Sequence, residues 1–387
     1  MKLPNLSLAQ KLSAIVLGAC ITMFLSTSFV ADRQAIDAIS RQSDANLESF
    51  AGQGQRGIQR DLRRIEDDVR IYSESAQIST MFRAINFAWV QVAGDKYQTL
   101  HEIFVDNNPH PAGEKDKLVR PDGVLSPYTK AHGAIHETLR NLARSAGYYD
   151  IFFINMNGEV IYSVFKEPDF ATNLRTGEFA DTGLAQVFEK SLTVAEGEYA
   201  VSDFTTYTPS NGAPAAFIGR PLLDDAGKPI GSIVFQLPLD RFNATMADLT
   251  GEGLRTYLVG TDGLLRSDIA ETDNSDILVS ESPVMVGENG ELVLVSGDVG
   301  VLGSAVDTEI NEINLNDVTW YVVAEAEQTI VSAPISQLNA ALMTTGVPVF
   351  LVVSLLAWLA IRRQTRSVGM LSDAVSEVVA DKDVVVP

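Results

Sequence analysis

The chain has 387 residues, with 29 Lys or Arg, 50 Asp or Glu and a formal net charge of −21. So acidic a chain argues against binding to nucleic acid or to an anionic lipid surface, because both repel negative protein charge. The only cysteine is Cys20, which excludes an intramolecular disulfide, and the length is enough for two modest cores.

The first element is an uncharged apolar run over residues 12–30, which follows Lys2 and Lys11. A signal peptide also has a basic start and an apolar stretch, and residues 26–28 offer a small-residue cleavage site. The run is longer than the roughly 7–15 residues of a signal peptide's apolar region, which favours an uncleaved anchor. We therefore predict a cytoplasmic N-terminus at 1–11 and a transmembrane helix at 12–30.

Residues 31–127 are predicted to form a long helical spine and a loop. Apolar residues recur at helical spacing up to about residue 93, with charged residues on the opposite face. Gly52, Gly54 and Gly57 predict a kink or a break in the middle of the helix. Residues 108–118 are rich in Pro, Gly and charge, which predicts a loop.

A second helical stretch carries His132 and His136, four residues apart on one face. This spacing can hold a metal ion, but a site needs a third ligand, so the plainer interpretation is two histidines bonded to nearby polar groups. We predict no metal and no cofactor.

Strand patterns follow. Residues 147–167 flank Asn157 and Gly158, a type I′ turn signal that predicts a β-hairpin. Two more strands are predicted at 215–222 and 230–237, joined by a turn at 224–227 and followed by a short helix at 240–249. Residues 128–250 thus read as a helix and an antiparallel sheet, with a long insertion between the second and third strands.

The pattern recurs in shorter form over residues 251–337. A hairpin is predicted at 257–268, around Thr261-Asp262-Gly263, and later strands at 291–295, 301–308 and 318–327. Two hairpins with turn signals at like positions suggest two similar modules in tandem.

Residues 338–361 form a second uncharged apolar run, longer than the roughly 20 residues that cross a bilayer. Arg362, Arg363 and Arg366 follow it and mark the cytoplasmic side, and Trp358 suits the headgroup level. Pro348 predicts a bend. Residues 31–337 would then form one loop outside the cytoplasm.

The last segment, 362–387, continues as a helix whose apolar residues fall at steps of three and four, the seam of a short parallel bundle. These residues are Val368, Leu371, Val375 and Val378.

Together these features resemble the double Cache sensors of bacterial transmembrane receptors. The resemblance rests on the helix between two spans and on the sequences at 147–167, 207–243 and 257–268. It is closest to methyl-accepting chemotaxis proteins, and residues 362–387 resemble the first helix and connector of a HAMP domain. A HAMP helix usually begins with proline where Ser367 and Val368 stand, and the second HAMP helix is missing, so we expect a fragment or a truncated receptor.

The resemblance implies an α+β fold: a long N-terminal helix with two tandem PAS-like antiparallel sheet modules, flanked by two transmembrane helices. The module at 128–250 would be membrane-distal and that at 251–337 membrane-proximal. It also implies a homodimer in the bacterial inner membrane with its sensor in the periplasm. Its partners would be a small-molecule ligand and cytoplasmic chemotaxis signalling proteins.

In some double Cache sensors an Arg–Tyr–Trp cluster binds the carboxylate of an amino acid. The tryptophans here are Trp89, Trp320 and Trp358, and none lies beside the expected pocket strand, so no motif supports an amino-acid ligand.

The sequence holds no catalytic set: it has four histidines, one cysteine in an apolar run and no phosphate-binding loop. We therefore expect no enzyme activity. Two alternatives stay open: the sensor half of a histidine kinase or nucleotide cyclase, and a passive membrane-tethered binding protein. The apolar seam in 362–387 disfavours the second alternative, because a passive tether needs no bundle-forming helix.

Charged residues in or next to apolar strands, with tyrosines near them, predict a small-molecule site in residues 128–250. The predicted ligand-binding residues are Tyr149, Asp150, Phe152, Tyr162, Lys166, Asp203, Tyr207 and Arg220. The alternative is that these charges lie at strand ends in solvent or form structural ion pairs.

Overall fold

The computed structural model describes residues 8–272, 275–286, 292–294 and 299–380. The chain divides into two compact units. One is residues 46–327, and the other combines the segment up to Ala45 with the segment from Gln328 onward.

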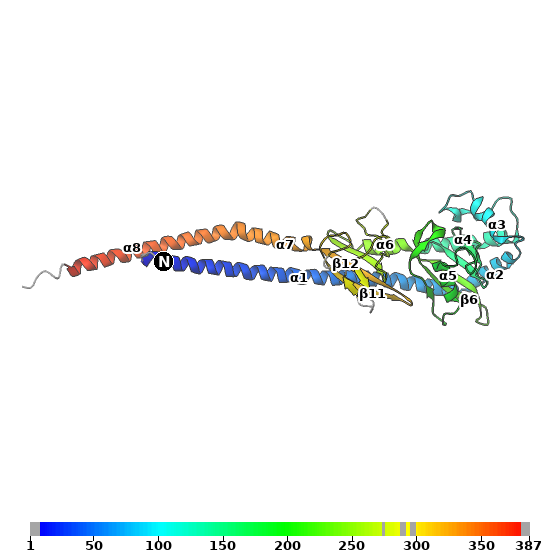
Figure 1. Cartoon of the computed structure of the whole chain (residues 1–387), viewed down its shortest axis with the longest axis horizontal. Helices are drawn as coiled ribbons and strands as arrows, with labels where there is room; N and C mark the ends of the chain where they lie inside the picture. Colours follow the sequence, from blue (N-terminus) through cyan, green and yellow to red (C-terminus); the bar gives the residue numbers. More distant parts are fainter. Residues whose placement is uncertain (1–7, 273–274, 287–291, 295–298, 381–387) are drawn as a thin grey trace, which may run out of the picture. The chain divides into compact units, whose positions relative to one another are not determined.

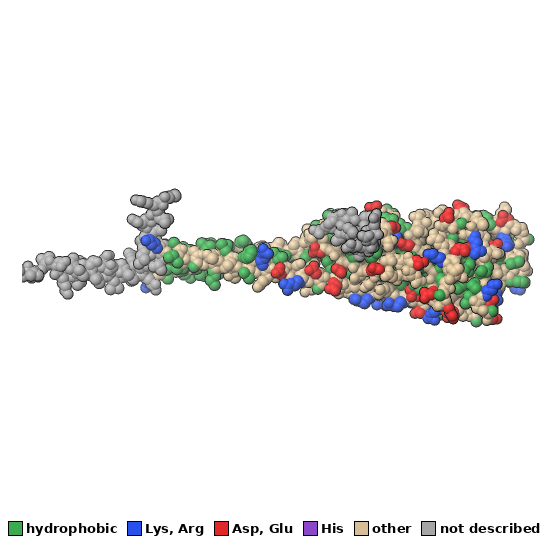
Figure 2. Space-filling view, turned by 60° about the horizontal axis from the view of Figure 1, so that its bottom comes forward, with side chains coloured by type: hydrophobic (Ala, Val, Ile, Leu, Met, Phe, Trp, Pro, Cys, Tyr) green, Lys and Arg blue, Asp and Glu red, His purple; other side chains and the backbone are tan. Residues whose placement is uncertain are grey.

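The second of these units is helical. It holds the first part of α1 (Leu8–Ser73), then α7 (Gln328–Ala341), the π-helical turn η4 (Leu342–Gly346) and α8 (Val347–Ala380). Among the described residues, two helical segments are long and apolar enough to cross a membrane, within Ala14–Ser73 and at Met343–Arg363. Figure 2 shows the apolar side chains that cover them. Both predicted apolar segments are therefore helices.

The π-helical turn η4 directly precedes α8, the helix that contains Pro348, and the bend predicted at Pro348 stays a prediction. Proline has no N–H to donate along the helix, so carbonyls of the preceding turn need other partners. The hydroxyls of Thr344 and Thr345 donate to the carbonyls of Ala340 and Ala341 at 2.9 and 2.6 Å. These carbonyls lie at and just before the start of η4, whereas the carbonyl that lacks its usual partner because of Pro348 is that of Thr344. The side chains of the predicted seam at 368–378, and residues 381–387, lie outside the described residues.

In residues 46–327, the helix α1 runs without interruption through Gly52, Gly54 and Gly57. The predicted break at these glycines is therefore wrong. Gly54 and Gly57 lie inside α1, where an added Cβ would come within 2.8 Å of Val322 and 2.7 Å of Thr245. They allow close packing of the helix. The break comes later, where Ser75 caps α2 (Ala76–Val90) by accepting a hydrogen bond from the Ile78 N–H.

The predicted loop and second helix follow. The loop contains short helical segments, and α4 begins with a capping box of Ser126 and Thr129 and ends at the left-handed Gly147. The elements are α3 (Lys96–His101), η1 (Glu102–Asp106), η2 (Lys115–Lys117) and α4 (Pro127–Ala146).

A five-stranded antiparallel sheet follows, in the order β2-β1-β7-β6-β3. The predicted strands and the long insertion between the second and third of them are confirmed. The sheet strands are β1 (Ile151–Asn155), β2 (Val160–Ser163), β3 (Ala200–Val201), β6 (Phe217–Leu223) and β7 (Pro229–Gln236). The insertion adds α5 (Gly183–Ser191), β4 (Thr205–Tyr207), η3 (Thr208–Ser210) and β5 (Ala213–Ala215), and α6 (Leu239–Ala247) leads out of the sheet.

The turn between β1 and β2 differs from the predicted type I′, which needs positive φ at two residues. Gly158 has φ 82°, but Asn157 is not left-handed. Instead the side-chain oxygen of Asn155 accepts hydrogen bonds from the N–H groups of Asn157 and Glu159, at 3.0 and 3.1 Å. This local bond replaces the turn that the sequence pair predicts.

The two faces of this sheet are covered by different helices (Figure 1). Alternate strand residues such as Phe153 and Phe235 pack with α1, α2 and α4. Residues of the opposite set, such as Phe152 and Val234, pack with α5. The sheet is therefore buried on both faces, and polar side chains within it lie in the core.

A three-stranded sheet, β11-β12-β8, forms after α6. The strand predicted at 318–327 is confirmed as β12, whereas the one predicted at 301–308 starts only at Val306. The hairpin predicted at 257–268 has one strand and isolated bridges. The strand predicted at 291–295 is described only at 292–294. The strands are β8 (Leu254–Gly260), β9 (Val284–Val286), β10 (Leu292–Leu294), β11 (Val306–Leu315) and β12 (Val318–Glu327). Residues Leu47 and Ala51 of α1 pack on Ala324 of this sheet.

Candidate functional site

A buried group of polar side chains lies where α4, the η2 turn, β1, β2 and the segment after β2 meet. We call it the polar cluster, and each of its residues is at most 1% exposed. Its members are Asp116, His132, His136, Asp150, Tyr162, Lys166, Asp169 and Tyr207.

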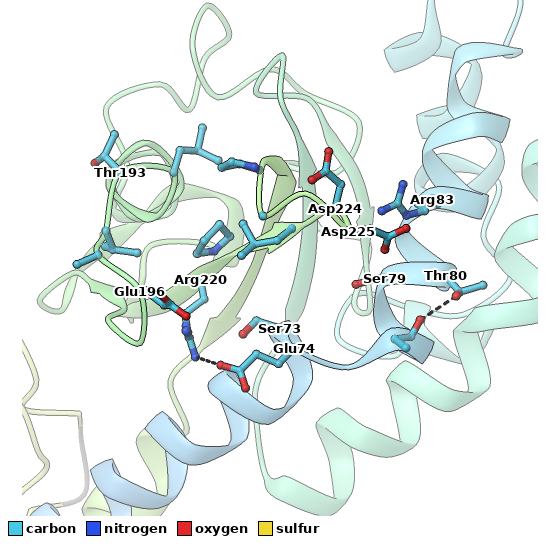
Figure 3. A pocket seen from close by; sticks show the side chains of 18 residues that line it. Ser73, Glu74, Ser79, Thr80, Arg83, Thr193, Glu196, Arg220, Asp224 and Asp225 are labelled. Carbon is cyan, nitrogen blue, oxygen red and sulfur yellow. Dashed lines mark hydrogen bonds and ion pairs between the residues drawn. The ribbon is translucent and has the colours of Figure 1, made fainter.

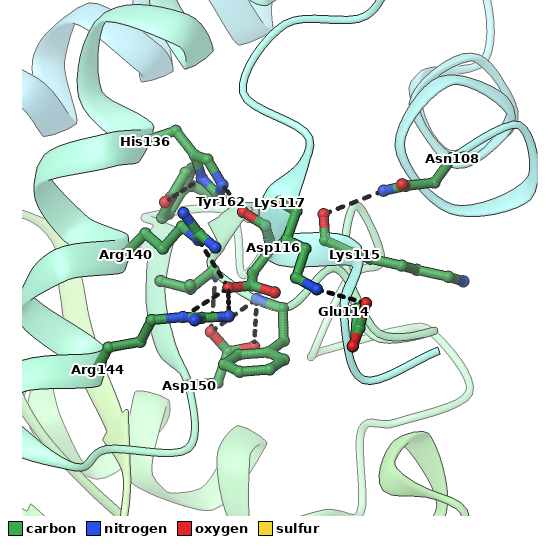
Figure 4. Close-up of polar contacts among 12 residues, drawn as sticks. Asn108, Glu114, Lys115, Asp116, Lys117, His136, Arg140, Arg144, Asp150 and Tyr162 are labelled. Carbon is green, nitrogen blue, oxygen red and sulfur yellow. Dashed lines mark hydrogen bonds and ion pairs between the residues drawn. The ribbon is translucent and has the colours of Figure 1, made fainter. Parts of the chain in front are cut away.

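Asp116 enters the cluster from the η2 turn (Figure 4). Its Oδ2 accepts hydrogen bonds from Arg140 Nε at 2.8 Å and from Arg144 Nη2 at 2.7 Å. Burial alone would raise the pKa of Asp116, but the two arginines outweigh it and the pKa is lowered. The carboxylate is therefore ionised, and its buried Oδ1 has no hydrogen-bond partner among the described residues.

The histidines of α4 are held in fixed tautomers. His136 Nε2 lies 2.7 Å from the carbonyl of Asp116, which can only accept, so Nδ1 accepts from the Tyr162 hydroxyl at 2.8 Å. His132 Nδ1 likewise donates to the Val119 carbonyl at 3.1 Å, which leaves Nε2 as an acceptor. That buried Nε2 has no partner among the described residues. Burial lowers the pKa of His136 to about 3, so it is neutral.

Lys166 lies inside the cluster on a left-handed backbone, with φ 57°. Its ammonium donates to the Ser163 carbonyl and lies 4.3 Å from the ring centre of Tyr162, 5.0 Å from that of Phe170 and 5.9 Å from that of Phe104. Burial lowers the pKa of Lys166 to about 7, although the nearby Asp150 opposes the change. Such strain and burial in a lysine are typical of a functional position.

Asp150 joins the strands of the hairpin. Its carboxylate accepts hydrogen bonds from the N–H groups of Ile151 at 2.6 Å, Val164 at 2.7 Å and Phe165 at 3.2 Å. Burial, together with the charge of Asp169, raises the pKa of Asp150 well above its usual range. Its bonds thus fix the start of the segment that carries Lys166.

Asp169 lies at the other side of the cluster and accepts a hydrogen bond from the Tyr207 hydroxyl. Its second oxygen, Oδ1, is buried and has no partner among the described residues. Burial raises the pKa of Asp169 to about 7, and the charge of Glu167 adds to the shift. Glu167 itself accepts from Tyr149 at 2.7 Å and from Ser210 at 2.6 Å, next to the cluster.

The structure brings together five of the eight predicted residues. Asp150, Tyr162, Lys166 and Tyr207 belong to the cluster, and Tyr149 lies beside it. The other three lie elsewhere. Phe152 packs against Phe217 on the opposite face of the sheet, with ring centres 6.1 Å apart. Asp203 bonds Arg266 and Trp320, and Arg220 bonds Glu74.

Sequence reasoning missed Asp116 and Asp169, and it named the histidines only as candidate metal ligands. The histidine rings stack with centres 4.5 Å apart, as neighbours on one helix face. Within the described residues, no three His, Cys, Asp or Glu side chains are grouped to hold a metal ion.

The cluster offers a ligand three buried polar atoms: Asp116 Oδ1 and His132 Nε2 accept hydrogen bonds, and Asp169 Oδ1 accepts when its carboxyl is ionised. Aromatic rings surround them. A few polar atoms among aromatic side chains form the usual lining of a small-molecule site. The set suits a ligand that carries N–H or O–H donors.

Comparison of the sequence with models of known protein families identifies one family. The family model dCache_1, described as a Cache domain, matches residues 32–335. A search of the curated proteins finds no match.

Three solved structures are similar to this chain at low identity. The ligand-binding domain of Pseudomonas fluorescens chemoreceptor CtaA in complex with L-serine is 14% identical, with a TM-score of 0.35, over 70% of this chain and 99% of that one. The ligand-binding domain of the Pseudomonas aeruginosa PAO1 amino acid chemoreceptor PctC in complex with GABA is 15% identical, with a TM-score of 0.32, over 65% and 97%. An extracellular ligand binding receptor from Desulfohalobium retbaense DSM5692 is 11% identical, with a TM-score of 0.34; the match covers 67% of this chain but 39% of that one.

The family match covers most of the chain and includes both sheets and the polar cluster. Two candidate membrane helices flank the sheets. The chain belongs to the dCache_1 family of Cache domains.

Proposed function

We propose that this chain is the sensory part of a transmembrane chemoreceptor, and that its polar cluster binds a small molecule. The observation that carries the proposal is a set of buried acceptors that lie among aromatic rings inside a Cache domain and have no hydrogen-bond partner in the part of the chain that the structure describes. The chain acts by binding, without catalysis.

The energetics of the cluster support a ligand. A buried acceptor that has lost water and gained no partner costs about 1–3 kcal/mol. Asp116, His132 and Asp169 each present one such atom. A ligand that donates to two or three of them removes this cost and stabilises the folded domain by mass action.

The membrane arrangement follows from the flanking segments. In this proposal both apolar segments span the bacterial inner membrane, the Cache domain lies in the periplasm, and the receptor is a homodimer. Arg362 and Arg363 directly follow the second segment, as positive residues do on the cytoplasmic side. Residues 362–387 then begin a HAMP domain that reaches cytoplasmic chemotaxis proteins.

Transmission has a physical route between the two sheets. Asp203 accepts from Arg266 Nε at 3.0 Å and Nη2 at 2.8 Å, and from Trp320 Nε1 at 2.7 Å. Four residues further along the chain, Tyr207 bonds Asp169 in the cluster. A ligand that hydrogen-bonds to Asp169 displaces the Tyr207 hydroxyl. Residues 203–207 then move with Tyr207, which changes the position of Asp203 against the second sheet. Its strand β12 leads directly into α7. A coupling of about 1–3 kcal/mol is enough for a useful response.

The test is a ligand screen on the detergent-solubilised full chain. We expect a small molecule with N–H or O–H donors to raise the melting temperature of the wild type. His132→Phe, which removes an unpartnered acceptor, should weaken its binding at least tenfold, as should Asp169→Ala. Tyr97→Phe, at a half-exposed tyrosine outside the cluster, is the matched control. A ligand that binds both cluster variants as tightly as the wild type would place the site elsewhere.

A further inference from the structure

A groove with a volume of about 870 Å³ lies between three segments: the junction of α1 and α2, the loop after α5, and the β6–β7 hairpin (Figure 3). None of its lining residues belongs to the polar cluster. Its size falls in the range of small-molecule sites, roughly 300–1,000 Å³. It is therefore a separate candidate, which the proposed sensing site leaves unused.

Arg220 supplies the groove with a buried positive charge. The residue is 7% exposed, and its Nη1 donates to Glu74 Oε1 at 3.1 Å. The Nε of this guanidinium is buried and has no hydrogen-bond partner among the described residues. A guanidinium has five N–H donors in a planar fork that suits two acid oxygens, and a single carboxylate bond leaves most of that capacity unused.

Two further features add positive charge along the wall of the groove. The α2 helix begins at Ala76, which lines the groove together with Ser79, so the positive end of the helix dipole lies at the groove. Arg83, also on α2, adds a second positive charge at the wall across from Arg220, beside Asp224 and Asp225 (Figure 3).

The rim has the opposite charge. Glu74, Glu196 and Asp225 are exposed carboxylates that line the groove. Asp224 also lines it, but its Oδ1 accepts from the N–H groups of its own turn, at Ala226 and Lys228. A simple anion would be repelled by the rim, and a simple cation would be repelled by the arginines. The arrangement is complementary to a molecule that carries both charges.

We propose that this groove binds a small zwitterion, with its acid group on Arg220 and its ammonium group among the rim carboxylates. The acid group competes with Glu74 for the guanidinium. Glu74 directly follows the last residue of α1, and Arg220 lies on β6. Binding therefore breaks the ion pair between Glu74, at the end of α1, and Arg220 of the sheet, and replaces it with an ion pair between the ligand and Arg220.

The test is isothermal titration of the solubilised full chain with glycine, β-alanine, L-alanine and glycylglycine, and with acetate and methylamine as singly charged controls. We expect at least one zwitterion to bind at least tenfold more tightly than either control. Failure of all four zwitterions to bind at 10 mM, or equal binding of acetate, would overturn the assignment.

Variants then locate the binding. Arg220→Met should weaken it at least tenfold, whereas Glu74→Gln, which removes the competing carboxylate, should strengthen it severalfold. Arg175→Met, at an arginine paired with Glu189 outside the groove, is the matched control. If Arg220→Met does not fold, Glu74→Gln decides alone: tighter binding supports the groove, and unchanged binding overturns it.

The variant His132→Phe distinguishes binding in the groove from binding in the polar cluster, because it changes only the cluster. Unchanged zwitterion binding in this variant assigns the binding to the groove, whether or not the proposed sensing site survives its own test. Lost binding would place the zwitterion in the cluster and overturn the groove.

Discussion

At the scale of single residues, the cluster places carboxylates of different character close together. Asp116 is bonded by two arginines and its pKa is lowered, whereas Asp169 has a tyrosine partner and its pKa is raised to about 7. The difference follows from the partners, because a guanidinium stabilises the charged form more than a hydroxyl does. Of these two carboxyls, Asp169 is thus the one that exchanges a proton near neutral pH.

The raised pKa of Asp169 makes the free energy of unfolding of the domain depend on pH. An unfolded Asp has a pKa of about 3.9, so between about pH 4 and pH 7 the folded protein binds more protons than the unfolded chain. The stability that this group contributes is present below pH 4 and is lost as the pH rises to 7. The side chain of Asp169→Asn stays neutral and keeps an acceptor for Tyr207. The stability of this variant should therefore not fall in this way as the pH rises. From pH 5 to pH 8 the free energy of unfolding of this variant should rise relative to that of the wild type by about 3 kcal/mol at most, because the two states differ in protonation over about two pH units of that range.

Melting curves of the solubilised chain at several pH values measure this gain. Asp122→Asn, at an exposed carboxylate, is the control and should follow the wild type. A constant difference between Asp169→Asn and the wild type across the pH range would show that Asp169 is ionised throughout.

The sequence revealed part of this site. Asp150 and Lys166 were predicted because a charge beside an apolar strand is conspicuous in a core that covers both faces of a sheet. Asp116 and Asp169 were missed because they lie in loops, where carboxylates are usually solvated. Only the fold shows that α4 and the sheet close over these loops. Arg220 was predicted for the same reason as Lys166, but the pleat of β6 points it to the junction of α1 and α2.

At the scale of elements, strong local patterns predicted the strands of the five-stranded sheet and most helices well, whereas in the three-stranded sheet only β12 kept its predicted bounds. The break in the long helix was placed wrongly because glycine has two uses, as a helix breaker and as a contact point for another element. Gly54 and Gly57 serve the second use, since side chains of β12 and α6 press against them. The actual break is marked by Ser75, an N-cap residue of the kind that begins helices.

A glycine of β7 offers a test of packing between elements. A Cβ at Gly231 would lie 2.2 Å from Phe82 Cζ and 2.6 Å from the Ile154 carbonyl oxygen. Gly231→Ala should therefore destabilise the domain by about 1–3 kcal/mol through overpacking. Gly251→Ala is the matched control, because no atom lies within 4 Å of its Cβ and its φ is not positive. Thermal or urea melting of the two variants compares them. Equal stability would mean that α2 does not pack against β7 at Gly231.

At the scale of the whole molecule, the bonds of Asp203 connect the two sheets. With ligand bound in the cluster, hydrogen exchange should slow in β1 and β2 and also in β12. Asp203→Ala removes the carboxylate that joins Arg266 and Trp320, while Asp262 still bonds Arg266. We therefore expect protection of β1 and β2 to remain and that of β12 to be lost. Lys190→Ala is the control, since it breaks only the exposed pair with Asp317. Persistent protection of β12 in Asp203→Ala would mean that another contact carries the coupling.

The membrane arrangement has its own test. In a Cys20→Ser background, a single cysteine at Asp225 should react with a membrane-impermeant thiol reagent in intact cells, whereas one at Asp381 should not. The reason is the positive charge after the second apolar segment, which holds that end in the cytoplasm. Lysed cells, in which both positions should react, provide the control. Equal labelling in intact cells would contradict the proposed topology.

The contacts of α1 also set an order of events during synthesis. The five-stranded sheet pairs strands that lie between residues 151 and 236, so it can form soon after they leave the ribosome. Leu47 and Ala51 of α1, by contrast, pack against Ala324, which is made much later. The stretch of α1 around Leu47 and Ala51 therefore keeps its apolar side chains unpaired until almost the whole domain has emerged, whereas the later part of α1, from Ile58 to Val69, can pack against the first sheet earlier. A chain truncated before β12 exposes these apolar side chains, so we expect it to aggregate even though the first sheet is complete.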